Sequence, residues 1–260
     1  MPDIKIDLNS DVGESFGNYK IGMDEQVIPL ISSANIACGF HAGDPSVMRH
    51  TISLARENGV AVGAHPGLPD LLGFGRRAMD VTLAEISDYV TYQIGAIAAF
   101  ARVENMTLQH VKPHGALYNM AVARPEIFET VARAMAAVDP ELILYVLGGA
   151  DRGPFEAISN RTGIRIAYEF FADRAYNPDG TLVSRREPGA MIHDQELAAK
   201  RVLQMAMEGT VTCIDGSVLK LGGETVCVHG DNPTALRLVQ KIRETLEDAG
   251  VKVCSPVTFL

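Results

Sequence analysis

The chain alternates short apolar runs with helical patterns, and this alternation limits its possible folds more than any other feature. The apolar runs lie at 4–8, 34–38, 60–64, 107–111, 142–147, 164–170 and 225–228, with a last short one at 251–254. The helical patterns lie between them, at 45–57, 83–104, 125–137, 195–208 and 233–249. Strands that alternate with helices predict βαβ units and a parallel sheet.

The number of these units favours a closed sheet. Roughly seven or eight βα units fit into the 260 residues, so the sequence predicts an α/β fold in which residues 1–260 form a single-domain (β/α) barrel, TIM-like or irregular and seven-stranded. An open, doubly wound sheet is the alternative. The apolar runs look continuous, as in strands that are covered on both faces. We expect a long ordered loop at 171–194 and a small β-hairpin at 211–224.

Composition excludes several classes of function. The net charge is −9 and no arginine-rich run occurs, which argues against a nucleic-acid partner. No run of about 18 apolar residues is present, so we expect no membrane span. The four cysteines form no CxxC pair, and the first residues lack a signal-peptide pattern. Reduced thiols and a cytoplasmic location are therefore expected.

Polar side chains follow most of the apolar runs, at the point where each expected strand ends. They are Asp7, Asn9 and Asp11 after the first run, His41 and Asp44 after the second, His65 after the third, and then Lys112 with His114, Asp173 with Arg174, and His229 with Asp231. Barrels and open parallel sheets both bind ligands at the carboxyl ends of their strands. We therefore expect these groups to converge in one cleft.

Several of these residues also have a purely structural interpretation. Asp44 stands before Pro45 and suits a helix N-cap, a role that it could combine with a role in the cleft. Asp7 and Asn9 alternate along a strand and can both point inward, where they could simply form a satisfied polar layer. His41 and His65 could each be hydrogen-bonded structural histidines.

The stretch VKPHG gives the strongest indication of chemistry. Lys112 stands two residues from His114, and a nearby cation lowers the pKa of an imidazole and keeps it neutral, as a base or a metal ligand must be. His50 and His193 are expected to be structural or exposed, and we leave His110, inside a strand, out of the site.

Other charged residues admit two interpretations. Asp173 and Arg174 could pair with other loop charges rather than bind substrate. The two arginines of GFGRR, at 73–77, suit an anion clamp or a solvated loop.

Metal sites and catalytic nucleophiles are recognised by different sequence motifs. Two histidines with a third histidine or an aspartate can hold a divalent ion and leave a position for water, and the candidates are Asp7, His41, His65 and His114. No HExxH motif supports them, so a metal stays an open question. No GxSxG motif occurs, and Cys38 lies in an apolar run typical of a core, so the sequence does not favour a serine or cysteine nucleophile.

Six stretches, in order, resemble the LamB/YcsF family, whose members are known as the A subunit of 5-oxoprolinase. They are DLNSDVGESFG, SANIACGFHAGDP, GAHPGLPDLLGFGRR, VKPHGALYN, FADRAYNPDGTLVSR and CVHGD. The resemblance implies a β/α barrel related to metal-dependent polysaccharide deacetylases. It also implies ATP-dependent opening of 5-oxo-L-proline to L-glutamate, with Mg²⁺ accompanying the ATP and two further subunits as partners.

The chain lacks the GxxxxGK[ST] loop that binds phosphates, so we expect nucleotide activation to need those partners. Within this hypothesis, the catalytic residues are Asp7, His41, His65, Lys112 and His114. The substrate-binding residues are Asn9, Asp44, Asp173, Arg174, His229 and Asp231. Lys112 and Arg174 suit the substrate carboxylate, a phosphate or an oxyanion.

Two rival functions use the same strand ends. The first is a stand-alone metal-dependent hydrolase, such as a deacetylase, which would act without ATP. The second is a non-catalytic subunit that only holds a ligand, although the density of His, Lys and Asp at the strand ends argues against it.

Overall fold

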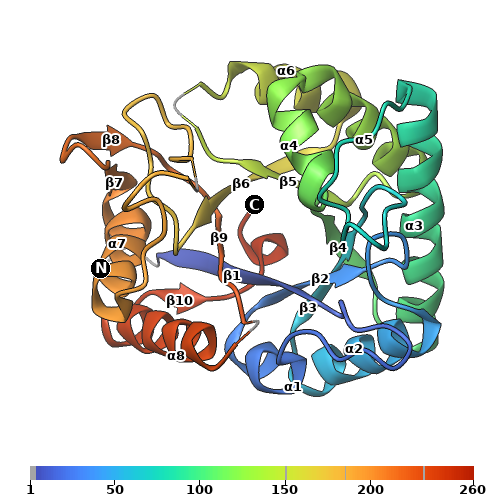
Figure 1. Ribbon diagram of the computed structural model, residues 1–260, viewed down its shortest axis with the longest axis horizontal. Coiled ribbons are helices and arrows are strands. Elements are labelled where there is room, and N and C mark those ends of the chain that lie inside the picture. Colours follow the sequence, from blue (N-terminus) through green and yellow to red (C-terminus); the bar gives the residue numbers. More distant parts are fainter. Residues whose placement is uncertain (1–3, 150, 185, 231) are drawn as a thin grey trace.

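Seven parallel strands close into a barrel at the centre of the computed structural model, which describes residues 4–149, 151–184, 186–230 and 232–260 (Figure 1). The strands are β1 (Lys5–Val12), β2 (Ser33–Ala37), β3 (Ala61–His65), β4 (Leu108–Val111), β5 (Ile143–Leu147), β6 (Arg165–Phe171) and β9 (Thr225–Cys227). They pair in that order, and β9 also pairs with β1, which closes the sheet. The predicted seven-stranded barrel is confirmed.

Helices surround the barrel on its outer side (Figure 1). They are α1 (Asp24–Val27), α2 (Pro45–Glu57), α3 (Leu83–Val103), α4 (Gly115–Ala123), α5 (Pro125–Val138), α6 (Gly153–Thr162), α7 (Gln195–Glu208) and α8 (Pro233–Asp248). The sequence predicted α2, α3, α5, α7 and α8 to within one residue at each end, but not α1, α4 or α6. None of the helices in the described part of the chain has the length and apolar character that a bilayer span needs.

The strands have two chemically different faces, which corrects the interpretation of continuous apolar runs. On β1, the outward Ile6 and Leu8 belong to the main apolar core beneath the helices. Asp7 and Asn9 point to the other side and are fully buried inside the barrel. Both hydrogen-bond to the hydroxyl of Thr225. Both faces are covered, as predicted, but much of the inner face is polar.

The C-terminal segment covers the amino-terminal end of the barrel. β10 (Lys252–Val253) pairs with the first residues of β1. Beyond it, the Ser255 hydroxyl donates to the Gln109 side chain on β4, across the barrel (2.7 Å). A short 3-10 helix, η2 (Pro256–Thr258), follows. Ligands must therefore enter at the opposite, carboxyl end of the strands.

Two further expectations concern the region between β6 and β9. Residues 172–194 form no helix or strand where they are described, as predicted, and bend over the carboxyl end of the barrel through bridges such as Arg174–Met191. The expected hairpin is also present, because β7 (Thr210–Thr212) pairs antiparallel with β8 (Val218–Lys220).

Candidate active site

The polar layer nearest the amino-terminal end of the barrel surrounds Asp7. Its carboxylate accepts hydrogen bonds from Ser32 Oγ (2.6 Å), Tyr145 OH (3.0 Å) and Thr225 Oγ1 (2.5 Å). Burial raises the pKa of Asp7 to about 6, and the hydroxyl donors only partly offset this effect. With its acceptor sites occupied by three neighbours, Asp7 behaves as a structural group in the barrel interior.

A chain of amides forms the next layer. Asn35 Nδ2 donates to Asn9 Oδ1 (2.7 Å) and to Asp11 Oδ1 (2.8 Å), while Asn35 Oδ1 accepts from His110 Nε2 (2.7 Å). A Cβ at Gly63 would overlap the ring of His110, so glycine at this position makes room for the imidazole. Burial lowers the pKa of His110 to about 3, which keeps the ring neutral.

Lys112 sits directly above the amides as a buried cation between two carboxylates. Its Nζ lies 3.0 Å from Asp11 Oδ1 and 2.8 Å from Glu169 Oε1. Burial opposes the charge on Lys112, but Asp11 and Glu169 outweigh it and raise its pKa well above the usual value. The same balance, with His65 and Lys112 outweighing burial, holds the pKa of Asp11 well below its usual range. The ammonium is therefore a permanent, fixed positive charge.

Three histidines from separate segments meet at the carboxyl end of the strands. His65 ends β3, His114 is the residue before α4, and His41 lies in the turn between β2 and α2. The rings of His41 and His114 stack with centroids 3.7 Å apart, and both meet the ring of His65 edge-on. All three rings are buried. Residues that follow three separate strands in the sequence therefore meet in one place, as expected.

Backbone carbonyls orient two of the rings. His65 Nδ1 donates to the Lys112 carbonyl (2.6 Å), and His114 Nε2 donates to the Phe74 carbonyl (2.9 Å). The remaining nitrogens, His65 Nε2 and His114 Nδ1, face each other at 2.9 Å. Burial, together with the neighbouring histidines, lowers the pKa of His114 to about 3 and that of His41 well below its usual value. Both rings are therefore neutral bases.

Glu14 reaches the histidines from the segment after β1. Its Oε1 lies 3.3 Å from His41 Nε2 and 3.6 Å from His114 Nδ1. Burial, and then the charge of Asp11, raises the pKa of Glu14. Glu14 and the three histidines offer four ligand atoms, all within 4.8 Å of one another, and could together hold a metal ion.

The turn that carries Phe74 must approach the histidines closely. Gly75 has φ +62°, and a Cβ on it would lie 2.6 Å from His41 Cβ and 2.8 Å from His114 Cδ2. Only glycine combines this backbone conformation with that proximity. The GFGRR stretch thus acts first through its backbone.

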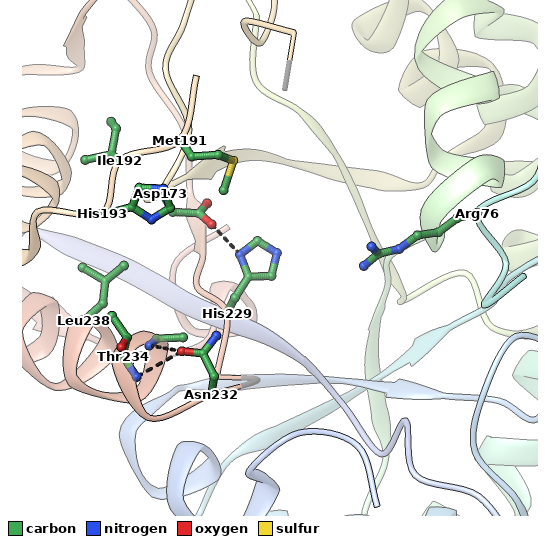
Figure 2. A pocket seen from close by; sticks show the side chains of 10 residues that line it. Arg76, Asp173, Met191, Ile192, His193, His229, Asn232, Thr234 and Leu238 are labelled. Atoms are coloured by element: carbon green, nitrogen blue, oxygen red, sulfur yellow. Dashed lines mark hydrogen bonds and ion pairs between the residues drawn. The ribbon is translucent and has the colours of Figure 1, made fainter. Parts of the chain in front are cut away.

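An ion pair, His229–Asp173, lies on the other side of the site. Asp173 Oδ2 accepts from His229 Nδ1 (3.0 Å), and Figure 2 shows Arg76 facing this pair across a pocket. Burial opposes protonation of His229, but Asp173 outweighs it and raises the pKa of the imidazole. His229 is therefore better able to carry a proton than His41 or His114, whose pKa values are lowered.

One cleft of about 490 Å³ connects these groups. Asp11, His65, Lys112, His114, Arg174 and His229 are among its lining residues. The pocket of Figure 2 adjoins it, since Arg76 and His229 line both. The cleft has room for a small molecule and presents it with the fixed cation of Lys112, the neutral imidazole of His114 and the imidazole of His229, whose pKa is raised.

Comparison with known proteins identifies the chain's relatives. Residues 6–259 match the model of the LamB/YcsF family. The chain belongs to the LamB/YcsF family. The resemblance seen in the sequence motifs is thereby confirmed.

Two known proteins are similar to nearly the whole of this LamB/YcsF chain. One is a protein of Thermococcus onnurineus named as the A subunit of 5-oxoprolinase, 55% identical over 257 residues, with 99% of this chain and 100% of that protein covered. The other is the crystal structure of the lactam utilization protein from Thermus thermophilus, 46% identical, with a TM-score of 0.91 and coverage of 96% of this chain and 99% of that one. A structure titled "T48 deacetylase with substrate" covers 96% of this chain and 87% of its own with a TM-score of 0.50 at 13% identity, and shares the fold alone.

The site of this LamB/YcsF member contains some of the predicted residues but not all. Lys112, Arg174 and His229 line the cleft with His65 and His114, and His41 and Asp173 contact that group. Arg174 is buried and donates to the Val183 carbonyl (2.7 Å). Asp7 and Asn9 lie deeper in the barrel and do not line the cleft.

One further predicted residue, Asp44, does not join the cleft group. Asp44 caps α2, accepting from the backbone N–H groups of Ser46 and Val47, and also holds Gly17 N (2.8 Å). This is the structural role that its position before Pro45 indicated. Asp231 lies outside the described residues.

Sequence patterns did not reveal the part that Glu14, Glu169 and His110 play in the site. Glu169 carried a signal, because a charged residue in the middle of the apolar stretch IAYEFF must have a partner inside the fold. His110 also carried a signal, since it stands two residues before Lys112 and therefore shares its face of the strand. Glu14 follows Asp11 by three residues in an irregular segment, and only the tertiary fold brings it to the histidines.

Proposed function

We propose that this chain is the A subunit of a 5-oxoprolinase, in which its cleft opens the lactam ring of 5-oxo-L-proline to give L-glutamate. The observation that carries the proposal is the convergence of the three histidines, Lys112 and the His229–Asp173 pair in one cleft of small-molecule size. The names of the two relatives, one belonging to a 5-oxoprolinase and the other to a lactam utilization protein, support the substrate class.

An unstrained five-membered lactam is a poor electrophile, so we propose that two partner subunits and Mg-ATP first phosphorylate its carbonyl oxygen. Water attacks the activated carbon and gives a tetrahedral intermediate. Expulsion of phosphate from this intermediate would only regenerate the lactam. Productive collapse breaks the C–N bond with a proton delivered to the nitrogen, leaving an acyl phosphate that a second water hydrolyses to glutamate and phosphate.

The residues of the cleft suit these steps. His229 protonates the departing ring nitrogen, since Asp173 holds its Nδ1 and favours the charged ring. Lys112 provides a fixed positive charge for the phosphate or for the developing oxyanion. The histidine cluster activates the attacking water. Arg76 and Arg174 suit the carboxylate and phosphate groups, because guanidinium ions bind such anions in a bidentate way.

Two accompanying proposals complete the assignment. Residues 1–260 act as one domain, since the whole described barrel contributes strands to the site. The protein works in the cytoplasm, because all four of its cysteines are free, and three of them, Cys38, Cys213 and Cys227, are buried as thiols.

The test is glutamate release from 5-oxo-L-proline and ATP by the chain alone and with its two proposed partner subunits. We expect release only from the complete set. The His114→Ala complex should lose roughly 10²–10⁴-fold in turnover, whereas a complex with the exposed His50→Ala should not. Full activity of the isolated chain with ATP would contradict the proposal that partner subunits activate the lactam. Full activity of the His114→Ala complex would exclude the cleft as the active site. ATP-independent deacetylation by the chain would support the stand-alone hydrolase instead.

A further inference from the structure

The hydrogen bonds of His65 and His114 fix where their protons lie. A backbone carbonyl only accepts, so His65 Nδ1 must carry the hydrogen that it donates to the Lys112 carbonyl (2.6 Å). For the same reason His114 Nε2 must carry the hydrogen that it donates to the Phe74 carbonyl (2.9 Å). His114 is neutral and a neutral imidazole has one N–H, so His114 Nδ1 is a bare lone pair.

His65 Nε2 faces this lone pair. His65 Nε2 and His114 Nδ1 are 2.9 Å apart, the distance of a hydrogen bond, and His65 Nε2 also lies 3.3 Å from Asp11 Oδ2. Two bare nitrogens would repel at that separation, so a positive charge must lie between or beside them. The charge is either an extra proton or a metal ion.

The surroundings distinguish a proton from a metal ion. A proton satisfies two atoms, yet four potential ligand atoms converge here, all within 4.8 Å of one another. Glu14 Oε1 is 3.6 Å from His114 Nδ1 and 3.3 Å from His41 Nε2. Three imidazoles and one carboxylate are a donor set typical of zinc and other divalent transition ions.

The spacing and the supporting contacts also fit a metal. Ligand nitrogens about 2.0–2.1 Å from one ion lie about 2.9 Å apart at a right angle and about 3.4 Å apart at the tetrahedral angle. The 2.9 Å between His65 and His114 suits this spacing, whereas His41, whose ring is stacked parallel to that of His114, must rotate for its nitrogen to reach the same ion. Ligating histidines usually donate their other N–H to a carbonyl or carboxylate, as His65 and His114 do here.

We propose that Glu14, His41, His65 and His114 bind one divalent transition-metal ion, with zinc the expected species. Asp7, the carboxylate considered from the sequence, is replaced by Glu14, because Asp7 is held by Ser32, Tyr145 and Thr225 deeper in the barrel. Asp11, also close to His65, is committed to Lys112.

The ion deepens the proposed function, and its catalytic role rests on that function. His65 and His114 line the cleft, so an ion between them is reached from the substrate side. A water on such an ion ionises near neutral pH and would supply the nucleophile for lactam opening.

The experiment measures binding of Zn²⁺ to the full chain, stripped with a chelator and dialysed, by calorimetry and elemental analysis. Co²⁺ absorption serves as a second probe of ligand type. We expect one ion per chain and a higher unfolding midpoint with Zn²⁺ than without it. His65→Ala and Glu14→Gln should weaken affinity by more than the about 10–100-fold typical of a supporting residue, and should abolish the thermal shift. The exposed His50→Ala should bind like the wild type.

The two proposals fail separately. No Zn²⁺ or Co²⁺ binding at millimolar concentration, or binding undiminished in both ligand variants, would overturn the metal site and leave a shared proton as the explanation. Glu14→Gln, the conservative variant, keeps the test valid where His65→Ala does not fold. Full glutamate release by the chelated complex would refute the ion's catalytic role but uphold the proposed function, whereas one bound ion without glutamate release would do the reverse.

Discussion

Replacing Lys112 by Met removes a buried cation that lies between two carboxylates inside the barrel. Asp11 and Glu169 lie 3.0 and 2.8 Å from Lys112 Nζ, and Lys112 and Glu169 are both buried. Met has similar length but no charge, so the variant leaves Glu169 without its counter-ion and Asp11 with His65 alone. Breaking a buried ion pair from one side typically costs 3–5 kcal/mol, because the partner stays desolvated and unpaired.

This cost converts into a measurable thermal shift. The entropy of unfolding is about 2.1 cal/mol/K per residue, which gives about 0.55 kcal/mol/K for 260 residues. A loss of 3–5 kcal/mol therefore lowers Tm by about 5–9 °C. Differential scanning calorimetry at pH 7 measures it, with Lys200→Met, an exposed lysine of α7, as the matched control.

A double-mutant cycle tests whether the charges themselves are responsible. Glu169→Gln should destabilise the wild type but should cost less, or even stabilise, in the Lys112→Met background, where Glu169 has lost its cation. The expected coupling is about 1–3 kcal/mol. Equal costs of Glu169→Gln in both backgrounds, or a Tm loss in Lys112→Met no larger than in Lys200→Met, would refute the buried-pair reasoning.

Three further predictions concern stability and geometry. Because burial raises the pKa of Asp7 from 3.8 to about 6, the protonated form is favoured by folding; its stabilisation is complete below pH 3.8 and is lost as pH rises through 6. The stability of the wild type minus that of Asp7→Asn should thus fall by about 3 kcal/mol between about pH 4 and 7 in urea titrations, and a difference independent of pH would contradict the assignment. Gly75→Ala should displace His41 and His114 and reduce turnover of the complex by about 100-fold. Gly39→Ala, also at a positive φ but with open space around the new Cβ, should lower only stability, so equal turnover in the two variants would count against the close-approach argument. Gly95→Ala, inside α3 with no atom within 4 Å of the new Cβ, should stabilise the protein by about 0.5–1 kcal/mol, and an unchanged or lower Tm would argue against a purely local helix effect.

Much of the architecture could be predicted because local signals fix it. The N-caps Asp44 and Asn232, each followed by proline, place the starts of α2 and α8 at the predicted residues. Short α4, which follows the VKPHG turn, lacked such a signal and was missed, since its cap His114 makes no side-chain capping bond. Helices of this kind depend on packing against the barrel rather than on their own sequence.

The site could be predicted only in part, for a related reason. Strand direction alone sends His41, His65 and His114 to one end of the barrel, and the structure brings their rings together. Strand direction does not say how deep each polar residue lies. Asp7, Asn9 and Asp11 look equivalent along β1, yet only Asp11 reaches the cleft.

The amino-acid sequence by itself determined three things: the parallel barrel, the family, and the end of the barrel that carries the site. Periodicity, caps and motifs are local properties and can be read without the tertiary structure. Tertiary structure decided the membership of the site. The register between β1, β4 and β6 places Glu169 beside Lys112, and the path of the chain after β1 brings Glu14 to the histidines. Such contacts join residues 27 to 100 positions apart, and they depend on closure of the barrel, which no local pattern encodes.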